Sequence, residues 1–169
     1  MVTLYNVISG DGYITERDGS EDFMPDDVFD DYIDLCKKSD VVVMGRRTYE
    51  AIQKYPKLLL DKFENLAVKK AVVTHDREFI LKQAYIRAFS PEDAVALGNR
   101  ILVSSGPGLN SYFLRKGMID LLILNKLNKK INKGIKPFDI DIKKFIGNPV
   151  STEVKNDRTM LTYKIHNLL

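Results

Sequence analysis

The hydrophobic positions of this chain fall into short runs that turn-forming residues separate. Five runs are predominantly apolar and have the length of buried strands: residues 2–8, 41–44, 71–74, 101–104 and 121–124. A shorter run at 85–88 predicts one more strand. The runs are continuous rather than alternating, which is typical of strands covered on both faces.

Segments with helical spacing lie between these strands. A helix is predicted to begin at Pro25, because proline suits the first turn and the acids after it favour the positive end of the helix dipole. One face of this helix is apolar: Phe29, Tyr32, Ile33 and Cys36. Three further helices are expected. One begins at Tyr49, one begins after Ser90 as its N-cap, and the third ends at Gly117. Residues 55–65 are predicted to form a loop or a short helix.

The C-terminal part of the chain has a different pattern. Residues 150–155 and 158–165 alternate apolar with polar positions around Asn156-Asp157, which is typical of a hairpin. Strands that alternate with helices and end in a hairpin predict a three-layer α/β/α fold. Its sheet is expected to be mainly parallel, with an antiparallel C-terminal hairpin at one edge. We expect one domain over residues 1–169, because a chain of this length buries roughly 70% of its unfolded surface in one core.

Composition narrows the functional classes. Apolar residues make up 44% of the chain and charged residues 29%, as in an ordinary globular protein. The net charge of +3 is too small to indicate nucleic acid as the partner. A single cysteine, Cys36, excludes an internal disulfide, and the lack of a signal peptide adds to the expectation of a cytoplasmic protein. No apolar run approaches the ~20 residues that cross a bilayer. His75 and His166 form no recognisable zinc site, so no metal is expected.

One connection is rich in lysine. Its cations are Lys126, Lys129, Lys130, Lys133 and Lys136. Such a run can bind a substrate phosphate or a polyanion, but this one lacks the interleaved aromatic residues typical of nucleic-acid surfaces. We interpret it as a solvated connection.

A glycine turn follows the run at 41–44. Gly45 precedes Arg46, Arg47 and Thr48, and the predicted helix comes next. Free N–H groups and the positive end of a helix dipole attract anions at such a turn. Arginine adds forked donors for phosphate oxygens, and threonine adds a hydroxyl. The pattern predicts a phosphate-binding turn, although it also fits an ordinary turn with two solvated arginines.

Two other predicted strands end in glycine-bearing turns, Gly10-Asp11-Gly12 and Gly106-Pro107-Gly108. Ligands of open α/β sheets bind beyond the carboxyl ends of the strands. A linear G-x-G-x-x-G fingerprint is absent, so an ordinary Rossmann site is not supported. We expect a phosphate cradle assembled from several of these turns.

Several segments together resemble a known family. Residues 7–14 are similar to an S-x-D-G-Y-I element, residues 18–23 to a D-G-S-x-D-W loop, and residues 43–50 to a V-M-G-R-x-T-Y-E turn. Residues 117–120 resemble G-L-V-D-E, and residues 134–138 resemble G-x-P-L-F. In this order and spacing they resemble the dihydrofolate reductase-like superfamily, and most closely its branch related to the RibD C-terminal reductase domain.

This resemblance implies an oxidoreductase of dihydrofolate reductase-like fold that uses NADPH. The cofactor's phosphates would be bound by the residues of the glycine turn: Gly45, Arg46, Arg47 and Thr48. An arginine there also suits the 2′-phosphate that distinguishes NADPH from NADH. The resemblance places the other cofactor-binding residues at neighbouring strand ends: Val7 and Ile14 by the nicotinamide, Thr74, His75 and Arg77 by the 2′-phosphate and adenine, and Ser105, Gly106, Gly108 and Leu109 along the pyrophosphate. For His75, an exposed loop position is the stronger interpretation.

Hydride transfer to a C=N or C=O carbon leaves negative charge on the heteroatom, so a proton must arrive nearby. Asp22 is the first candidate for a catalytic carboxylate, because it stands at the acid of the family's D-G-S-x-D-W loop. Asp11 and Asp27 are further candidates. A turn between two glycines also explains Asp11, and a helix N-terminus also explains Asp27.

The predicted function is NADPH-dependent reduction of a small pterin- or pyrimidine-like heterocycle, as in riboflavin biosynthesis, by a cytoplasmic enzyme. The family branch also suggests a homodimer. Two alternatives stay open, and a departure from the family pattern bears on each. Ser105-Gly106 replaces a Gly-Gly pair and Pro107 follows, which favours a catalytically weak NADP-binding protein. Dihydrofolate reductase is the other alternative, although only Lys69 and Lys70 stand where an arginine would grip the folate carboxylate.

Overall fold

The computed structural model describes residues 1–167. At its centre lies an eight-stranded sheet in the order β5-β4-β3-β6-β1-β7-β10-β9. Its strands are β1 (Val2–Ile8), β3 (Val41–Gly45), β4 (Lys69–Val73), β5 (Ile86–Ala88), β6 (Ile101–Val103), β7 (Leu121–Leu127), β9 (Ser151–Val154) and β10 (Arg158–Lys164). The strands from β5 to β7 pair in parallel, and β10 pairs antiparallel with β7 and β9. The predicted parallel sheet with an antiparallel C-terminal hairpin at one edge is confirmed.

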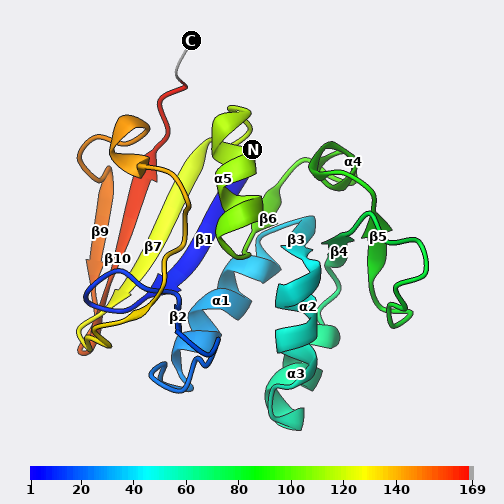
Figure 1. The fold of residues 1–169 in the computed structure, drawn as a ribbon, viewed down its shortest axis with the longest axis horizontal. Coiled ribbons are helices and arrows are strands. Elements are labelled where there is room, and N and C mark those ends of the chain that lie inside the picture. The colour runs from blue at the N-terminus through cyan, green and yellow to red at the C-terminus, as the bar shows by residue number, and fades with distance from the viewer. Residues whose placement is uncertain (168–169) are drawn as a thin grey trace.

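Helices cover both faces of this sheet (Figure 1). The structure contains α1 (Val28–Lys37), α2 (Arg46–Gln53), α3 (Lys57–Glu64), α4 (Pro91–Val95), α5 (Pro107–Arg115) and the short 3₁₀ helix η1 (Ile142–Lys144). The first three α-helices pack on one face, and α4 and α5 pack on the other. The three-layer α/β/α architecture is therefore confirmed.

Strand β3 shows why the apolar runs are continuous. Successive side chains of a strand point to opposite faces. Val41 and Val43 join the core cluster under α4 and α5, whereas Val42 and Met44 join the cluster under α1, α2 and α3. All four side chains are fully buried, so no position in the run can be polar without a partner.

Two helix starts differ from the sequence prediction. Helix α1 begins at Val28, three residues after Pro25, because the N–H of Val28 bonds back to the Pro25 carbonyl in a tighter turn. Helix α2 begins at Arg46 rather than Tyr49, directly after the extended Gly45. Its first turn therefore contains Arg46 and Arg47 and no acid, although the helix dipole disfavours cations there. Tertiary context fixes this helix start against local preference.

A second, two-stranded sheet was not predicted from the sequence. It pairs β2 (Thr15–Glu16) with β8 (Gly134–Ile135) in antiparallel register. A Cβ at Gly134 would overlap the Thr15 carbonyl oxygen, so only glycine fits between these strands. The pairing fastens the loop after β1 to the segment after β7.

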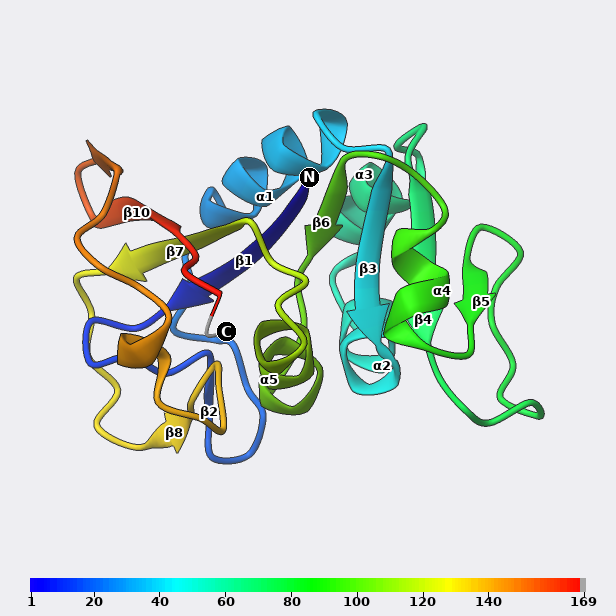
Figure 2. The same cartoon turned by 90° about the horizontal axis from the view of Figure 1, so that it is seen from above.

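The parallel strands bring their carboxyl ends to one edge of the sheet. Figure 2 shows β1, β6 and β3 running side by side, and α5 and α2 begin where β6 and β3 end. The turns after these strands contain Gly10, Gly106 and Gly45 respectively. The fold therefore places the three glycine-bearing turns at the same edge, as the sequence predicted.

Candidate functional site

Two helices begin at neighbouring strand ends on opposite faces of the sheet, α2 after β3 and α5 after β6. Each starts from an extended glycine, Gly45 or Gly106, and within residues 1–167 neither start has a side-chain cap. Among the described residues, nothing lies within 4 Å of a Cβ placed at Gly106 or Gly108. No side chain there therefore blocks access to the backbone N–H groups at the start of α5. Ligands of open α/β sheets bind where neighbouring strands send their helices to opposite faces.

Ser105 joins the two helix starts. Its hydroxyl oxygen accepts a hydrogen bond from Gly45 N–H at 3.0 Å and lies 3.3 Å from the Thr48 hydroxyl. A Cβ at position 45 would lie 3.2 Å from that oxygen and 3.8 Å from the Leu109 side chain. The close approach of the two turns therefore favours glycine at 45, because a Cβ there would press on the Ser105 hydroxyl. The structure brings the predicted phosphate-binding residues of both turns together, and their role stays a prediction.

Two buried asparagine side chains form hydrogen bonds with this junction from the protein interior. Asn6 Nδ2 of β1 donates to the Ser105 carbonyl at 3.0 Å. Asn110 Nδ2 of α5 lies 2.8 Å from Asn6 Oδ1, 2.9 Å from the Ser105 carbonyl oxygen and 3.0 Å from the Pro137 carbonyl oxygen. Both side chains are almost fully buried. Their hydrogen bonds fix the end of β6 relative to β1.

The two arginines of the glycine turn have different surroundings. Arg46 Nε lies 3.2 Å from Glu50 Oε1, and its Nη1 lies 3.1 Å from Asp76 Oδ2. Its guanidinium also stacks 4.1 Å from the centre of the Phe79 ring. Arg47 is exposed and forms no ion pair within the described part of the chain. Arg46 is therefore already oriented, and Arg47 is available to a ligand.

Thr74, His75 and Arg77 follow β4, the strand beside β3. The buried Thr74 hydroxyl accepts a hydrogen bond from Asp76 N–H at 3.2 Å. His75 is exposed, and the exposed Arg77 lies 5.5 Å from the Phe89 ring centre. The ion pair between Arg46 and Asp76 connects this loop to the glycine turn. The predicted adenosine side of the site thus adjoins the predicted phosphate side.

Val7 and Ile14 lie at the end of β1 and in the loop after it. Val7 is half-buried and pairs with Asn125 of β7. Ile14 is buried, and its N–H donates to the Ile135 carbonyl at 2.8 Å. The small sheet of β2 and β8 therefore positions Ile14 beside the end of β1.

The predicted acids have very different environments. The Asp11 carboxylate accepts hydrogen bonds from the Ser9 hydroxyl at 2.6 Å and from the N–H groups of Ile131 at 3.1 Å and Asn132 at 2.7 Å. These bonds, that from Ser9 above all, lower the pKa of Asp11 to about 2. Its carboxylate fastens two loops together, which is a structural task. Asp22 is exposed, and its side chain forms no hydrogen bond within residues 1–167. A catalytic role for either stays a prediction.

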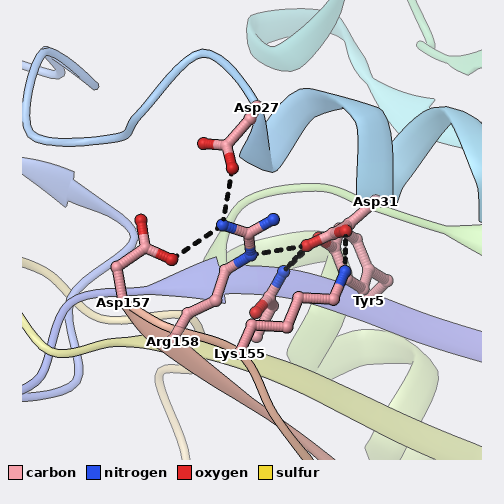
Figure 3. A network of polar contacts seen from close by, with 7 residues as sticks. Tyr5, Asp27, Asp31, Lys155, Asp157 and Arg158 are labelled. Atoms are coloured by element: carbon pink, nitrogen blue, oxygen red, sulfur yellow. Dashed lines mark hydrogen bonds and ion pairs between the residues drawn. The ribbon is translucent and has the colours of Figure 1, made fainter.

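Asp27 belongs to a charged cluster between α1 and the hairpin (Figure 3). Arg158 Nη1 lies 3.0 Å from Asp27 Oδ2, and its Nε lies 2.8 Å from Asp31 Oδ2. The side chains of Arg158 and Asp31 are each only 6% exposed. Lys155 Nζ and Asn125 Nδ2 also donate to the Asp31 carboxylate. A buried carboxylate is thus matched by one buried cation, one surface cation and one amide.

The sequence prediction missed Asp31. Burial alone would raise its pKa, but the hydrogen bonds from Arg158, Lys155 and Asn125 outweigh burial and lower the pKa below 3.8. The one available signal was its spacing: Asp31 lies three residues after Val28, on the buried side of an otherwise apolar helix.

A second missed acid is Glu21, beside the predicted Asp22. Burial raises the pKa of Glu21, and a 2.6 Å hydrogen bond from the Tyr55 hydroxyl opposes that shift. Tyr55 also packs edge-on against Phe29 at 5.7 Å between ring centres. These contacts fasten the loop before α1 to the segment after α2.

Two hollows flank the ends of β7 and β10. One, of about 340 Å³, lies at the charged cluster and is lined by Asp27, Lys155, Asn156, Asp157 and Arg158. The other, of about 420 Å³, is lined by Gly10, Lys126, Leu127, Asn128, Lys130, Thr159 and Leu161. Asp27 is the predicted acid that borders a hollow.

The lysine-rich connection is solvated, as expected, since all five lysines are exposed. No helix in the described residues is long and apolar enough to span a membrane. Among residues 1–167, no group of three or more His, Cys, Asp or Glu side chains is arranged to hold a metal ion.

Comparison with known proteins gives relatives at low identity. No family model matches the chain. An uncharacterized protein, YwjB of Bacillus subtilis strain 168, is 28% identical over 146 residues, which cover 80% of each chain. Its description assigns no activity.

Solved structures show which fold the chain has. A diaminohydroxyphosphoribosylaminopyrimidine deaminase/5-amino-6-(5-phosphoribosylamino)uracil reductase from Thermotoga maritima matches 98% of this chain with a TM-score of 0.73 and 16% identity. The match spans only 56% of that longer protein. A putative riboflavin biosynthesis protein from Shewanella sp. PV-4 matches over 98% of both chains with a TM-score of 0.73 and 19% identity.

Dihydrofolate reductase from Enterococcus faecalis, solved in complex with NADP(H) and RAB-propyl, matches 98% of this chain and 96% of its own. Its TM-score is 0.67 and its identity 16%. The chain therefore has the dihydrofolate reductase-like fold, close to that of RibD reductase domains. The resemblance seen in the sequence is confirmed at the level of the fold.

The buried pair of Asp31 and Arg158 generates a stability prediction. Replacing Arg158 with Leu leaves Asp31 without its buried cation and is expected to cost about 3–5 kcal/mol of unfolding free energy. Urea unfolding at pH 7 measures this loss. The matched control is Arg115→Leu, which breaks an exposed pair with Asp139 and is expected to change little. Equal losses in the two variants would contradict the prediction.

The same pair predicts a pH dependence. Because the pKa of Asp31 in the folded protein lies below 3.8, the unfolded chain binds this proton more tightly. The stabilisation is therefore complete above the unfolded pKa and is lost as the pH falls through the lowered folded pKa. The stability difference between the wild type and Arg158→Leu is expected to be largest near neutral pH and to shrink below about pH 4. A difference that stays constant down to pH 2 would argue against it.

Proposed function

We propose that this protein is an NADPH-dependent reductase that delivers a hydride to a small pterin- or pyrimidine-like heterocycle. One observation carries the proposal: two helix starts without side-chain caps, at neighbouring strand ends on opposite faces, are joined by the Ser105 hydroxyl. The relatives that share the fold include a reductase of an aminopyrimidine and a dihydrofolate reductase solved with NADP(H).

The residues present fit a dinucleotide. The backbone N–H groups of Gly106 and Gly108 and the first turn of α2 suit a pyrophosphate, because glycine keeps side chains away from the close approach. Arg47, which forms no ion pair within residues 1–167, is unfavourable at a helix start alone but becomes favourable when an anion lies beside it. Arg46 is already paired with Glu50 and Asp76. Thr48 adds a hydroxyl donor. Arg47 at this helix start thus supports a bound phosphate.

The proposed direction of the nucleotide places its two ends over different strands. The adenosine end would lie over β4, where Thr74 and Arg77 lie. The nicotinamide end would lie over β1, beside Val7 and Ile14. The bound nicotinamide supplies the hydride. The chain's own residues orient the substrate, exclude water and hold the proton-bearing groups.

The substrate is proposed to lie at the hollow beside the charged cluster. The exposed Asp27 and the partly exposed Lys155 offer an acceptor and a donor at its wall, which suits the alternating N–H and C=O groups of a pyrimidine or pterin ring. Asp27 is therefore proposed as the acid that positions the heterocycle. The homodimer and the cytoplasmic location stay predictions.

Dihydrofolate reductase itself is a weaker candidate. Lys70 is buried and donates to the carbonyls of Leu66 and Val68, and Lys69 donates to the Leu97 carbonyl. Both lysines begin β4 and so lie at the opposite edge of the sheet from the glycine turns. Neither is placed to bind a folate carboxylate. The NADP-binding protein of low activity is favoured by Pro107, which removes one N–H from the first turn of α5.

Nucleotide binding tests the cofactor assignment. NADPH at a hundredfold excess over its Kd is expected to raise the unfolding free energy by about 2.7 kcal/mol, seen as a higher melting temperature. Arg47→Ala is expected to weaken NADPH binding about tenfold or more, because a charge-assisted bond is lost. Lys54→Ala is the matched control, since it removes a cation just past the opposite end of α2. No melting shift with NADPH or NADH would end the proposal.

Turnover tests the substrate assignment. NADPH oxidation is expected with ribosylated aminopyrimidine phosphates, and Asp27→Asn is expected to lower kcat/KM at least tenfold without changing the Kd for NADPH. Asp22→Asn is the comparison variant from the same loop. A larger loss of kcat/KM in that variant would assign the role of the acid to Asp22 instead of Asp27. Faster turnover of dihydrofolate would favour the dihydrofolate reductase alternative. Binding without turnover of any of these compounds would favour the NADP-binding protein of low activity.

A further inference from the structure

We propose that Asp76 is a specificity-determining residue that limits the preference of this site for NADPH over NADH. The inference rests on the proposed function, because it concerns the adenosine end of the same nucleotide site. It is carried by the ion pair between Asp76, after β4, and Arg46, the first residue of α2.

Arg46 is held from three sides. Its Nη1 donates to Asp76 Oδ2 at 3.1 Å, its Nε donates to Glu50 Oε1 at 3.2 Å, and its guanidinium stacks on Phe79 at 4.1 Å. The guanidinium is therefore oriented before a ligand arrives. Its positive charge is opposed by two carboxylates, so an incoming phosphate meets a cation that is already paired.

Asp76 is fixed by its own loop rather than by the ion pair alone. Its N–H donates to the Thr74 hydroxyl at 3.2 Å, and its Oδ1 accepts from Glu78 N–H at 3.0 Å. Arg87 donates to the carbonyl oxygens of Asp76 and Phe79, which fastens the rest of the loop. The Asp76 carboxylate therefore stays in place when a ligand binds.

The Asp76 carboxylate is expected to weaken the binding of NADPH and to favour the binding of NADH. A 2′-phosphate on Arg46 lies near a fixed like charge, and repulsion weakens its binding. A ribose 2′-hydroxyl instead donates a hydrogen bond to the carboxylate. In dinucleotide sites an acid on the 2′-hydroxyl marks NAD and an arginine marks NADP. Here Arg46 and Asp76 stand side by side, so the attraction of one is offset by the repulsion of the other.

The test compares two variants, each of which removes the negative charge of one carboxylate that is paired with Arg46. Asp76→Asn keeps the Oδ1 acceptor for Glu78 N–H, so the loop is retained. Glu50→Gln is the matched control, because Glu50 lies one helical turn farther from the start of α2. Titration calorimetry at low ionic strength gives the Kd of each protein for NADPH and for NADH. Asp76→Asn is expected to bind NADPH about tenfold more tightly and NADH no more tightly. Glu50→Gln is expected to change the ratio less than twofold.

The outcomes separate this inference from the proposed function. If both nucleotides bind but Asp76→Asn leaves the ratio unchanged, the role of Asp76 is overturned and the proposed function stands. An equal change in Glu50→Gln also overturns it, because the effect is then one of net charge. If no protein binds either nucleotide, the proposed function fails and the inference with it. Melting without nucleotide checks folding, and Asp76→Ser, which keeps a short oxygen acceptor, replaces Asp76→Asn if that variant unfolds.

Discussion

The hydrogen bond from Gly45 N–H to the Ser105 hydroxyl is the constraint on which this site depends. It joins the ends of β3 and β6, the two neighbouring strands whose helices pack on opposite faces of the sheet. Because Gly45 has no side chain, the two turns approach closely enough for one hydroxyl to serve both. The buried side chains of Asn6 and Asn110 donate hydrogen bonds to the Ser105 carbonyl, and these bonds fix the position of Ser105 in the junction. The starts of α2 and α5 therefore lie close together at the carboxyl ends of the parallel strands.

The molecule separates its charges into two different arrangements. At the carboxyl ends of β3 and β6, Arg46 and Arg47 stand at a helix start where the dipole opposes cations, and only Arg46 is offset there by carboxylates within residues 1–167. Under the hairpin, Asp31 and Arg158 satisfy each other inside the protein and need no ligand. Asp27 and Lys155 continue that buried pair to the surface, where a hollow lies beside them. In the proposed function the first arrangement binds a phosphate, and Asp27 and Lys155 at the hollow bind the heterocyclic ring.

Much of the fold could be predicted from the sequence because each strand between two helical layers must be apolar on both sides. Residues 41–44 illustrate this, since all four side chains are buried and alternate between two cores. The sheet of β2 and β8 could not be predicted, because each strand has two residues and finds its partner about 120 positions away. The apolar spacing predicts the start of α2 at Tyr49, whereas the helix begins at Arg46, directly after the extended Gly45, although local preference disfavours cations in a first turn.

The sequence by itself determined the succession of the main-sheet strands and their helices along the chain, the hairpin and the glycine-bearing turns, since these follow from local periodicity and turn chemistry. It also named Gly45, Thr48 and Ser105 as candidates, but not the hydroxyl that joins them. Only the tertiary structure decided which charges face each other: Asp31 with Arg158 across 127 positions, and Arg46 with Asp76 across 30. The reason is physical. Periodicity reports which face of an element is buried, whereas a charge pair depends on distances between elements that no local pattern encodes.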